Sequence, residues 1–181
     1  MTWDLPEKAT FGGAEYSHRT DFREILKLLG LLSDEEKPAV HRWHTALYYF
    51  YRQEIPPQYH REAMDYLGHF LTAGEQSAPG PRLFDWQADA QAIAAGVNAV
   101  AGFEVRSVPK LHWWTFLGYF KSIGEGQFAQ LVAIRDKLRR GKKLEPHEQE
   151  FYRTHRSQIH RKSPDTEEKR RLEALLQKGK G

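Results

Sequence analysis

Apolar residues recur at intervals of three and four along most of this chain, the spacing of one face of an α-helix. The first such stripe covers residues 22–32, and others cover about 40–51, 58–73, 84–102, 110–122 and 127–139. More strongly charged helical patterns follow from about 144 to the end. Strand signals are confined to the first twenty residues. The pattern therefore predicts a mainly α fold of about six to eight helices.

The N-terminal segment, residues 1–20, is predicted to form a short β-hairpin. Its run ATFGGAEY sets two short extended pieces around a Gly-Gly dipeptide that accepts the positive φ of a tight turn. Thr20 is the expected N-cap of the next helix. We expect a helical domain over 21–162, interrupted by a polar linker rich in proline and glycine at 74–82. For residues 163–181, the sequence predicts a charged C-terminal helix or tail.

The second helical stripe contains a pair of histidines that raises the question of a metal site. His41 and His44 share a helix face, as paired ligands do. No third ligand lies at a useful offset, and His44 falls beside Val40 and Leu47 on the stripe expected to face the core. We therefore interpret these residues as core or boundary histidines and predict no metal.

Composition restricts the chemistry that is available to the 181-residue chain. Cysteine is absent, which excludes disulfides, thiolate nucleophiles and cysteine-based zinc sites. The sequence has no Gly-x-Ser-x-Gly elbow and no phosphate-binding loop. No apolar run has the length of a membrane span, and the N-terminus lacks the apolar stretch of a signal peptide. We expect a non-enzymatic cytosolic protein with no cofactor and no membrane contact.

Charge is unevenly distributed along the chain. Residues 135–181 hold 15 Lys/Arg against 8 Asp/Glu, a net charge of +7, whereas residues 1–134 hold 12 against 16, a net charge of −4. The basic part could be a solvated helical face, a protein contact or a nucleic-acid contact. Nucleic acid is the least favoured of these, because carboxylates are interspersed and no recognition motif is present.

The densest aromatic segment is PKLHWWTFLGYF, residues 109–120. Wound as a helix, it sets Trp113, Phe116 and Leu117 on an ordinary core-facing stripe. His112 falls on the remaining, more polar side, where the sequence gives it no catalytic partner.

A second stripe of the same helix is formed by Leu111, Trp114 and Gly118. A helix that is apolar on two sides either packs centrally or shares one side with a partner. Both alternatives remain open, and these three residues are our candidate partner-binding site.

Arg135 lies on the apolar stripe of its helix, beside Leu131 and Leu138. A covered guanidinium needs a carboxylate, helix-end carbonyls or an aromatic face. Candidate carboxylates, among which the sequence does not choose, are Asp21, Asp85 and Glu125.

Several segments together resemble a family of small siphophage proteins, the gene-product-fifteen family. The most specific segment is LHWW at 111–114, followed by an Ile-Arg pair about twenty residues after it. The resemblance covers roughly 10–160, departs from the family pattern in the alanine-rich segment 87–102, and has no counterpart after 162. The residues that carry this signature are Asp21, Phe22, Asp85, Trp86, His112, Trp113, Phe116 and Arg135.

This resemblance implies a function that the spacings alone do not show. Genes of the family typically lie between those of the major tail protein and the tape-measure protein. The resemblance therefore implies a chaperone-like tail assembly factor that binds the tape-measure protein, the tail-tube protein or both in the host cytoplasm. Alternatives are a connector or tail-completion protein kept in the virion, and a nucleic-acid-binding module that uses the basic C-terminal helices. Homo-oligomer formation is left open.

Overall fold

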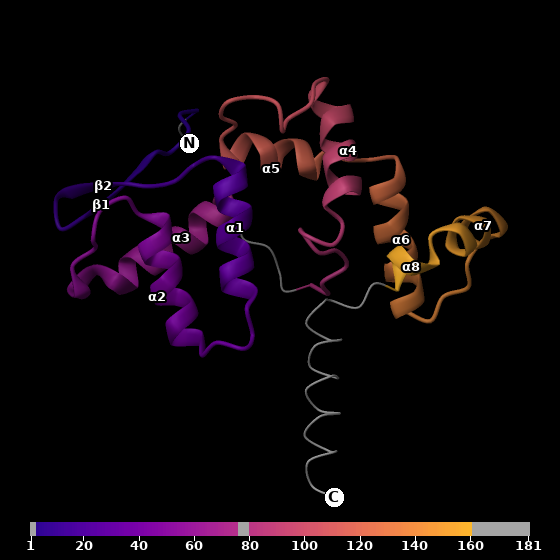
Figure 1. The fold of residues 1–181 in the computed structure, drawn as a ribbon, viewed down its shortest axis with the longest axis horizontal. Coiled ribbons are helices and arrows are strands. Elements are labelled where there is room, and N and C mark those ends of the chain that lie inside the picture. Colours follow the sequence, from indigo (N-terminus) through magenta and orange to yellow (C-terminus); the bar gives the residue numbers. More distant parts are fainter. Residues whose placement is uncertain (1–2, 76–79, 161–181) are drawn as a thin grey trace, which may run out of the picture. The chain divides into compact units, whose positions relative to one another are not determined.

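The computed structural model describes residues 3–75 and 80–160, and these residues are mainly helical (Figure 1). The predicted fold class, a mainly α chain with a short N-terminal β-hairpin, is confirmed. The predicted tail at 163–181 and residues 76–79 of the predicted linker lie outside the described residues. The elements are β1 (Lys8–Phe11), β2 (Ala14–Ser17), α1 (Phe22–Ser33), α2 (Ala39–Phe50), the 3₁₀ helix η1 (Pro57–Tyr59), α3 (His60–Leu71), α4 (Ala90–Ala101), α5 (Trp113–Lys121), α6 (Gln127–Arg139), α7 (Pro146–Thr154) and α8 (Arg156–Ile159).

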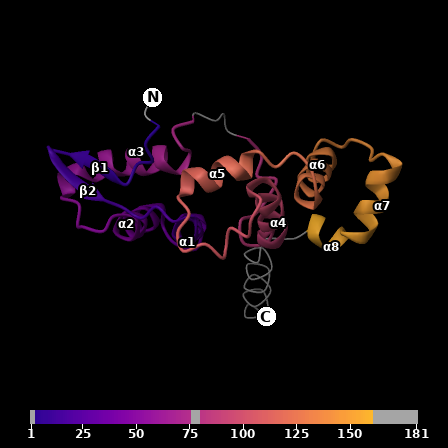
Figure 2. The ribbon, with the colours of Figure 1, turned by 90° about the horizontal axis from the view of Figure 1, so that it is seen from above.

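The chain divides into two compact units that are not simple halves of the sequence. Unit 1 consists of residues 1–79 and 100–122, and unit 2 of residues 80–99 and 123–181. Unit 1 holds the hairpin with α1, α2, α3 and α5, and its first three helices lie beside the hairpin in both ribbon views (Figures 1 and 2). Unit 2 holds most of α4 together with α6, α7 and α8.

The hairpin is antiparallel and its turn requires glycine. Gly12 and Gly13 have φ values of 55° and 79°, the left-handed region in which a side chain is strained. A Cβ added to Gly12 would also overlap the hydroxyl of Tyr59. Phe11 is buried and its ring contacts that of Tyr66 on α3, which provides the packing that an isolated hairpin lacks.

Unit 1 is held together by apolar faces of α1, α2 and α3. The residues that these three helices bury are Phe22, Ile25, Leu28, Ala46, Leu47, Phe50, Ala63, Leu67 and Phe70. Two local predictions are wrong. Asp21, not Thr20, is the N-cap of α1, because its carboxylate accepts the Arg23 N–H at the start of the helix. Val40 is 66% exposed and His41 and His44 are also exposed, so these positions face solvent and the interpretation of the two as core or boundary histidines is wrong.

Unit 2 has its own small apolar cluster. Leu131 and Ile134 of α6 pack with Ile159 of α8, and partly buried apolar side chains close the cluster. Helix α7 begins with a capping box in which Glu145 and Glu148 satisfy each other's backbone N–H groups. These contacts fix α6, α7 and α8 within one unit.

Candidate functional site

The two most specific signature segments meet where α1 and α5 begin. Asp21 and His112 form an isolated antiparallel bridge, although they are 91 positions apart in the sequence. The Phe22 N–H donates to the Leu111 carbonyl at 3.0 Å, and the Trp113 N–H donates to the Thr20 carbonyl at 2.7 Å. The N-terminal turns of both helices are therefore joined through backbone hydrogen bonds.

An ion pair stabilises this junction. The Arg23 Nε and one terminal nitrogen each donate to the Asp21 carboxylate at 2.8 Å, and the Leu111 N–H donates to it at 3.0 Å. Burial alone would raise the pKa of Asp21, but the hydrogen bonds from Arg23 and Leu111 outweigh it and the pKa is lowered. The carboxylate thus stays charged and joins the N-terminus of α1 to the residues that precede α5.

His112 is buried at this junction, so its predicted placement on the polar side of the helix is wrong. It is the N-cap of α5, and its Nδ1 accepts the Trp114 N–H at 3.1 Å. Because the Pro6 carbonyl, 3.0 Å from Nε2, can only accept, the ring proton lies on Nε2. Burial lowers the pKa of His112, which favours this neutral form. The histidine fixes the N-terminal segment to α5.

The two adjacent tryptophans of the signature segment bind the C-terminal carbonyls of helix α3. The last carbonyls of a helix have no partner within it. The Trp113 indole N–H donates to the Leu71 carbonyl at 3.0 Å, and the Trp114 indole N–H donates to the Phe70 carbonyl at 2.9 Å. Trp113 is fully buried, as the core stripe predicted. The paired tryptophans therefore act as a cap that packs α5 against α3.

The aromatic packing continues from this cap into α1. Phe116 of α5 stacks on Phe22 of α1, with ring centroids 4.4 Å apart, and it also stacks on Trp113. The unit 1 part of the signature is thus a continuous set of contacts that joins α1, α3 and α5.

The three candidate partner-binding residues differ in their surroundings. Gly118 is exposed, and a Cβ added to it would meet no atom within 4 Å. Leu111 and Trp114 are partly buried, and the Trp114 ring lies against Phe70 and His69 of α3. Trp114 already has a role within unit 1, and its predicted role in binding a partner stays a prediction.

In unit 2, the signature residue Arg135 holds its guanidinium among partners from three segments. Its carboxylate partner is Asp89, and the proposed partners Asp21, Asp85 and Glu125 are wrong. Two nitrogens of Arg135 donate to the two Asp89 oxygens at 2.7 and 2.9 Å. The other N–H groups donate to the carbonyls of Leu83, Gln158 and Ile159. All five donors of the guanidinium are used, so this one side chain links α6, the segment before α4 and α8.

Asp85 and Trp86 support this centre from the turn that precedes α4. Asp85 accepts the N–H groups of Gln87 and Ala88, and its own N–H donates to Asp89 at 2.9 Å. The Trp86 ring contacts Phe84 edge-on. Sequence reasoning missed Asp89, although its position four residues after Asp85 at a helix start was a usable signal.

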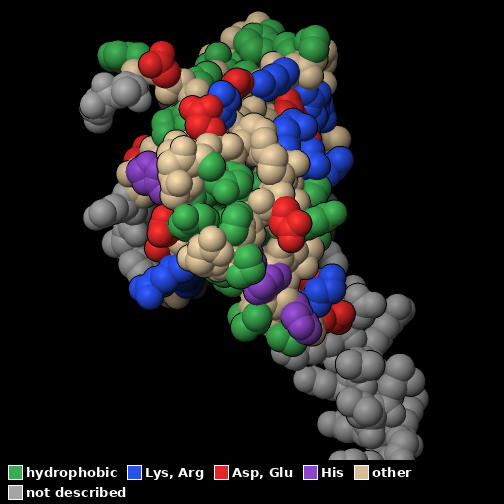
Figure 3. Space-filling model, turned by 90° about the vertical axis from the view of Figure 1, so that its left-hand side faces the viewer, with side chains coloured by type: hydrophobic (Ala, Val, Ile, Leu, Met, Phe, Trp, Pro, Cys, Tyr) green, Lys and Arg blue, Asp and Glu red, His purple; other side chains and the backbone are tan. Residues whose placement is uncertain are grey.

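The largest exposed apolar side chains of unit 1's helices lie on α2. We call the exposed residues Val40, His41, His44, Thr45 and Tyr48 the α2 outer face. Tyr48 is 87% exposed, and positions 40, 44 and 48 line up along the helix. The space-filling view from this end of the chain shows hydrophobic side chains at the surface together with histidines (Figure 3). Within the described ranges, no three His, Asp or Glu side chains are placed to hold a metal ion.

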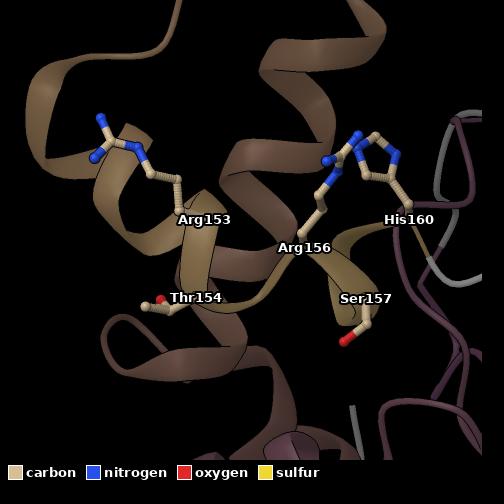
Figure 4. Close-up of a pocket in the computed structure, with 5 residues that line it drawn as sticks. All are labelled: Arg153, Thr154, Arg156, Ser157 and His160. Carbon is tan, nitrogen blue, oxygen red and sulfur yellow. The ribbon is translucent and has the colours of Figure 1, made fainter.

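A basic surface lies around the junction of α7 and α8. Arg153, Thr154, Arg156, Ser157 and His160 line a shallow, open pocket there. The Arg156 side chain extends in the direction of His160 in the close-up, whereas Arg153, Thr154 and Ser157 point elsewhere (Figure 4). Neither arginine forms an ion pair with any residue that the structure describes. The side chains supply positive charge, but they do not point toward a common position at which a ligand could bind.

The fold and these surfaces define a small, mainly helical protein with exposed apolar and basic faces. A family model described as "Bacteriophage Gp15 protein" matches residues 1–160, and the chain therefore belongs to this family, which confirms the resemblance. Membership identifies it as a phage structural or assembly protein. Searches of curated proteins and of solved structures gave no significant match. In the part of the chain that the structure describes, no helix is long and apolar enough to cross a membrane.

Proposed function

We propose that this protein is a non-enzymatic, chaperone-like phage tail assembly factor that binds the tape-measure protein, the tail-tube protein or both. Family membership supports a role in phage structure or assembly. The tail, its partners and the host cytoplasm as the place of action are our proposal, as is the absence of catalysis.

The observation that carries the proposal is the exposure of the α2 outer face. Val40 and Tyr48 place apolar surface in water on one side of a helix whose opposite side is packed in the core. Exposed apolar surface on one side of a helix is characteristic of recognition by another protein. Val40 and Tyr48 lie two turns apart on this side, with His44 between them. A long helical tape-measure protein offers a matching stripe, and binding would cover apolar surface on both proteins.

Co-expression with the tape-measure protein from the same phage tests this proposal. We expect the unaltered chain to raise the soluble yield of the tape-measure protein and to co-purify with it. The double variant Val40→Ala/Tyr48→Ala should lose most of this effect. Phe103→Ala, which truncates an exposed aromatic residue of unit 1 outside α2, is the matched control and should keep it. Unchanged solubility together with no co-purification would exclude the chaperone role.

Presence or absence in the finished virion distinguishes an assembly factor from a structural component. An assembly factor leaves the particle, whereas a connector or tail-completion protein stays in it. Mass spectrometry of purified virions should therefore find little or none of this protein. Stoichiometric amounts in the virion would replace the chaperone proposal with the structural alternative.

A nucleic-acid-binding role is the second candidate, and one observation favours it. Lys142, Lys143, Arg153 and Arg156 are exposed and form no ion pair with other described residues of unit 2. If these cations contact phosphates, retention on DNA should fall steeply with salt, and neutralising Lys142, Lys143, Arg153 and Arg156 should flatten the dependence. Absence of retention at low salt would remove this candidate.

A further inference from the structure

The described chain begins with an exposed apolar and acidic arm. We call Trp3, Asp4 and Leu5 the N-terminal arm. Trp3 is fully exposed and Leu5 is 47% exposed, and Asp4 forms no ion pair with any described residue. A tryptophan left wholly in water is unusual, since this residue is the typical anchor of protein interfaces.

The base of the N-terminal arm is firmly attached to unit 1. The Pro6 carbonyl accepts from His112, as described above, and the Glu7 carbonyl accepts the His18 N–H at 3.1 Å. The Glu7 carboxylate pairs with Lys110 at 2.9 Å. The arm is therefore presented from a fixed point, which lowers the entropic cost of docking it into another surface.

A groove in unit 2 has the complementary character. Leu83, Phe84, Leu138 and Ile159 contribute apolar surface to it, and Arg139 and His160 lie among its lining residues. The groove has a volume of about 410 Å³, within the range of about 300–1,000 Å³ for ligand pockets. Leu138 is 36% exposed, so an apolar contact is available at its surface. We call this the unit 2 groove.

Charge favours the N-terminal arm as the occupant of the unit 2 groove. The two carboxylates that line the groove, Asp85 and Asp89, are already paired with Arg82 and Arg135, and Arg139 is paired with Asp136. The positive charge that is not paired with a described residue therefore lies beside the groove. His160 also lines the neighbouring basic pocket of Arg153 and Arg156, so positive charge continues beyond the groove. An acidic, apolar segment fits this surface.

The alternative occupant within the chain is its own C-terminal segment, and charge argues against it. Residues 161–181 carry 7 Lys/Arg and 4 Asp/Glu, a net charge of +3. Unit 1 carries 11 Lys/Arg against 13 Asp/Glu, a net charge of −2, and unit 2 without residues 161–181 carries 9 against 7, a net charge of +2. Long-range attraction thus also favours an approach of unit 1 of one molecule to unit 2 of another.

We propose that the N-terminal arm of one copy docks in the unit 2 groove of a second copy. Trp3 and Leu5 cover the apolar surface of the groove, and Asp4 faces Arg153 or Arg156, which form no ion pair with described residues. The contact joins two different surfaces, so each molecule keeps one free arm and one free groove, and association continues head to tail. This proposal concerns self-association and does not depend on the tail-assembly role.

Sedimentation velocity of the full chain over the micromolar to sub-millimolar range tests the proposal. We expect the mean mass to rise with concentration and to fall with added salt, because the charged contacts are screened. Trp3→Ala should weaken association by roughly thirtyfold or more, the usual effect of losing an anchoring aromatic residue. Leu138→Glu, which places an acid in the groove, should do the same. Phe103→Ala, an exposed aromatic truncation outside the arm and the groove, is the control and should associate as the unaltered chain does.

Mixing the two defective variants gives the decisive result. Trp3→Ala retains a working groove and Leu138→Glu retains a working arm, so together they should form a dimer that cannot grow further. Three results would each overturn the proposal. The first is a monomer in every sample, and the second is self-association that Trp3→Ala does not weaken. The third is a mixture of the two variants that forms no dimer. Loss of association in a variant truncated after His160, with Trp3→Ala unchanged, would assign the contact to the C-terminal segment instead. Circular dichroism of each variant confirms that its helices are formed.

Discussion

The ion pair between Asp89 and Arg135 gives the sharpest test of how unit 2 is held together. The Asp89 side chain is 2% exposed and that of Arg135 is 14% exposed, and the guanidinium uses all five of its N–H donors. We consider the single variants Asp89→Asn and Arg135→Gln and the double variant that combines them. Each single change removes one charge and leaves the other one buried.

The expected cost follows from the burial of the pair. Removing one partner of a buried ion pair typically costs about 3–5 kcal/mol of unfolding free energy, because the remaining charge has lost its compensation. The double variant leaves no uncompensated charge and should lose clearly less than the sum of the two. We therefore expect a coupling energy of at least about 2 kcal/mol, near the upper end of the usual range for contacting residues.

Urea unfolding followed by circular dichroism gives the global loss, and hydrogen exchange with peptide resolution assigns it to a unit. Amides of α6 and α8 should exchange faster in both single variants, whereas those of α1 in unit 1 should change little. Arg139→Gln is the matched control, since Arg139 lies one turn further along α6 and its ion pair with Asp136 is exposed. It should cause a far smaller loss.

Two results would refute this reasoning. The first is a loss in the single variants no larger than that of Arg139→Gln, which would mean that water replaces the missing partner. The second is a double variant whose loss equals the sum of the single ones, which would mean that the two side chains act independently.

Three further predictions concern unit 1. Trp113→Ala should cost about 3–5 kcal/mol, because it removes a fully buried ring and leaves a cavity. Trp114→Ala should weaken partner binding more than folding, and equally large losses in thermal melts would make both residues purely structural. Burial lowers the pKa of His18 to about 4, against about 6.5 in an unfolded chain, so the unfolded state takes up the proton first. The His18 contribution of about 3 kcal/mol is therefore full above pH 6.5 and lost as the pH falls towards 4. His18→Gln should reduce the fall in the urea midpoint between pH 7 and pH 5, and a fall as large as that of the unaltered chain would contradict this assignment. Gly12→Ala should destabilise the chain more than Gly13→Ala in the same melts, because both residues have positive φ but only the Gly12 Cβ would strike Tyr59; equal losses would show that Tyr59 moves aside.

Local patterns were sufficient to predict the helices and the hairpin. The spacing of apolar residues by three and four reflects the geometry of a single helix, and the Gly-Gly turn involves only two residues. Both signals can therefore be read from a short stretch of sequence. The burial of Trp113 and Phe116 followed from the same spacing. The need of Arg135 for a partner was also predictable, since its helix position requires a covered guanidinium.

What the sequence did not reveal depends on pairing between distant segments. Thr20 and Asp21 are both acceptable N-caps, and the bridge to His112 decides between them. His112 looked polar on a helical wheel, but it precedes the helix and is buried against the N-terminal segment. Asp89 escaped notice because α4 was expected to begin at about 84, whereas it begins at Ala90 and leaves Asp89 in a turn that faces α6. No local rule brings residues 89 and 135 together.

The order of segments along the chain has a consequence for synthesis. Unit 1 is interrupted after residue 79 and resumes at residue 100, and the tryptophans that cap α3 come later still. A chain that emerges from the ribosome therefore presents α1 and α3 with the Phe22 ring and the Phe70 and Leu71 carbonyls still without their α5 partners. At about 5–20 residues per second, this interval lasts on the order of seconds. During that time the sides of α1 and α3 that pack against α5 remain exposed in the nascent protein, and they are covered only once Trp113 and Trp114 have been synthesised.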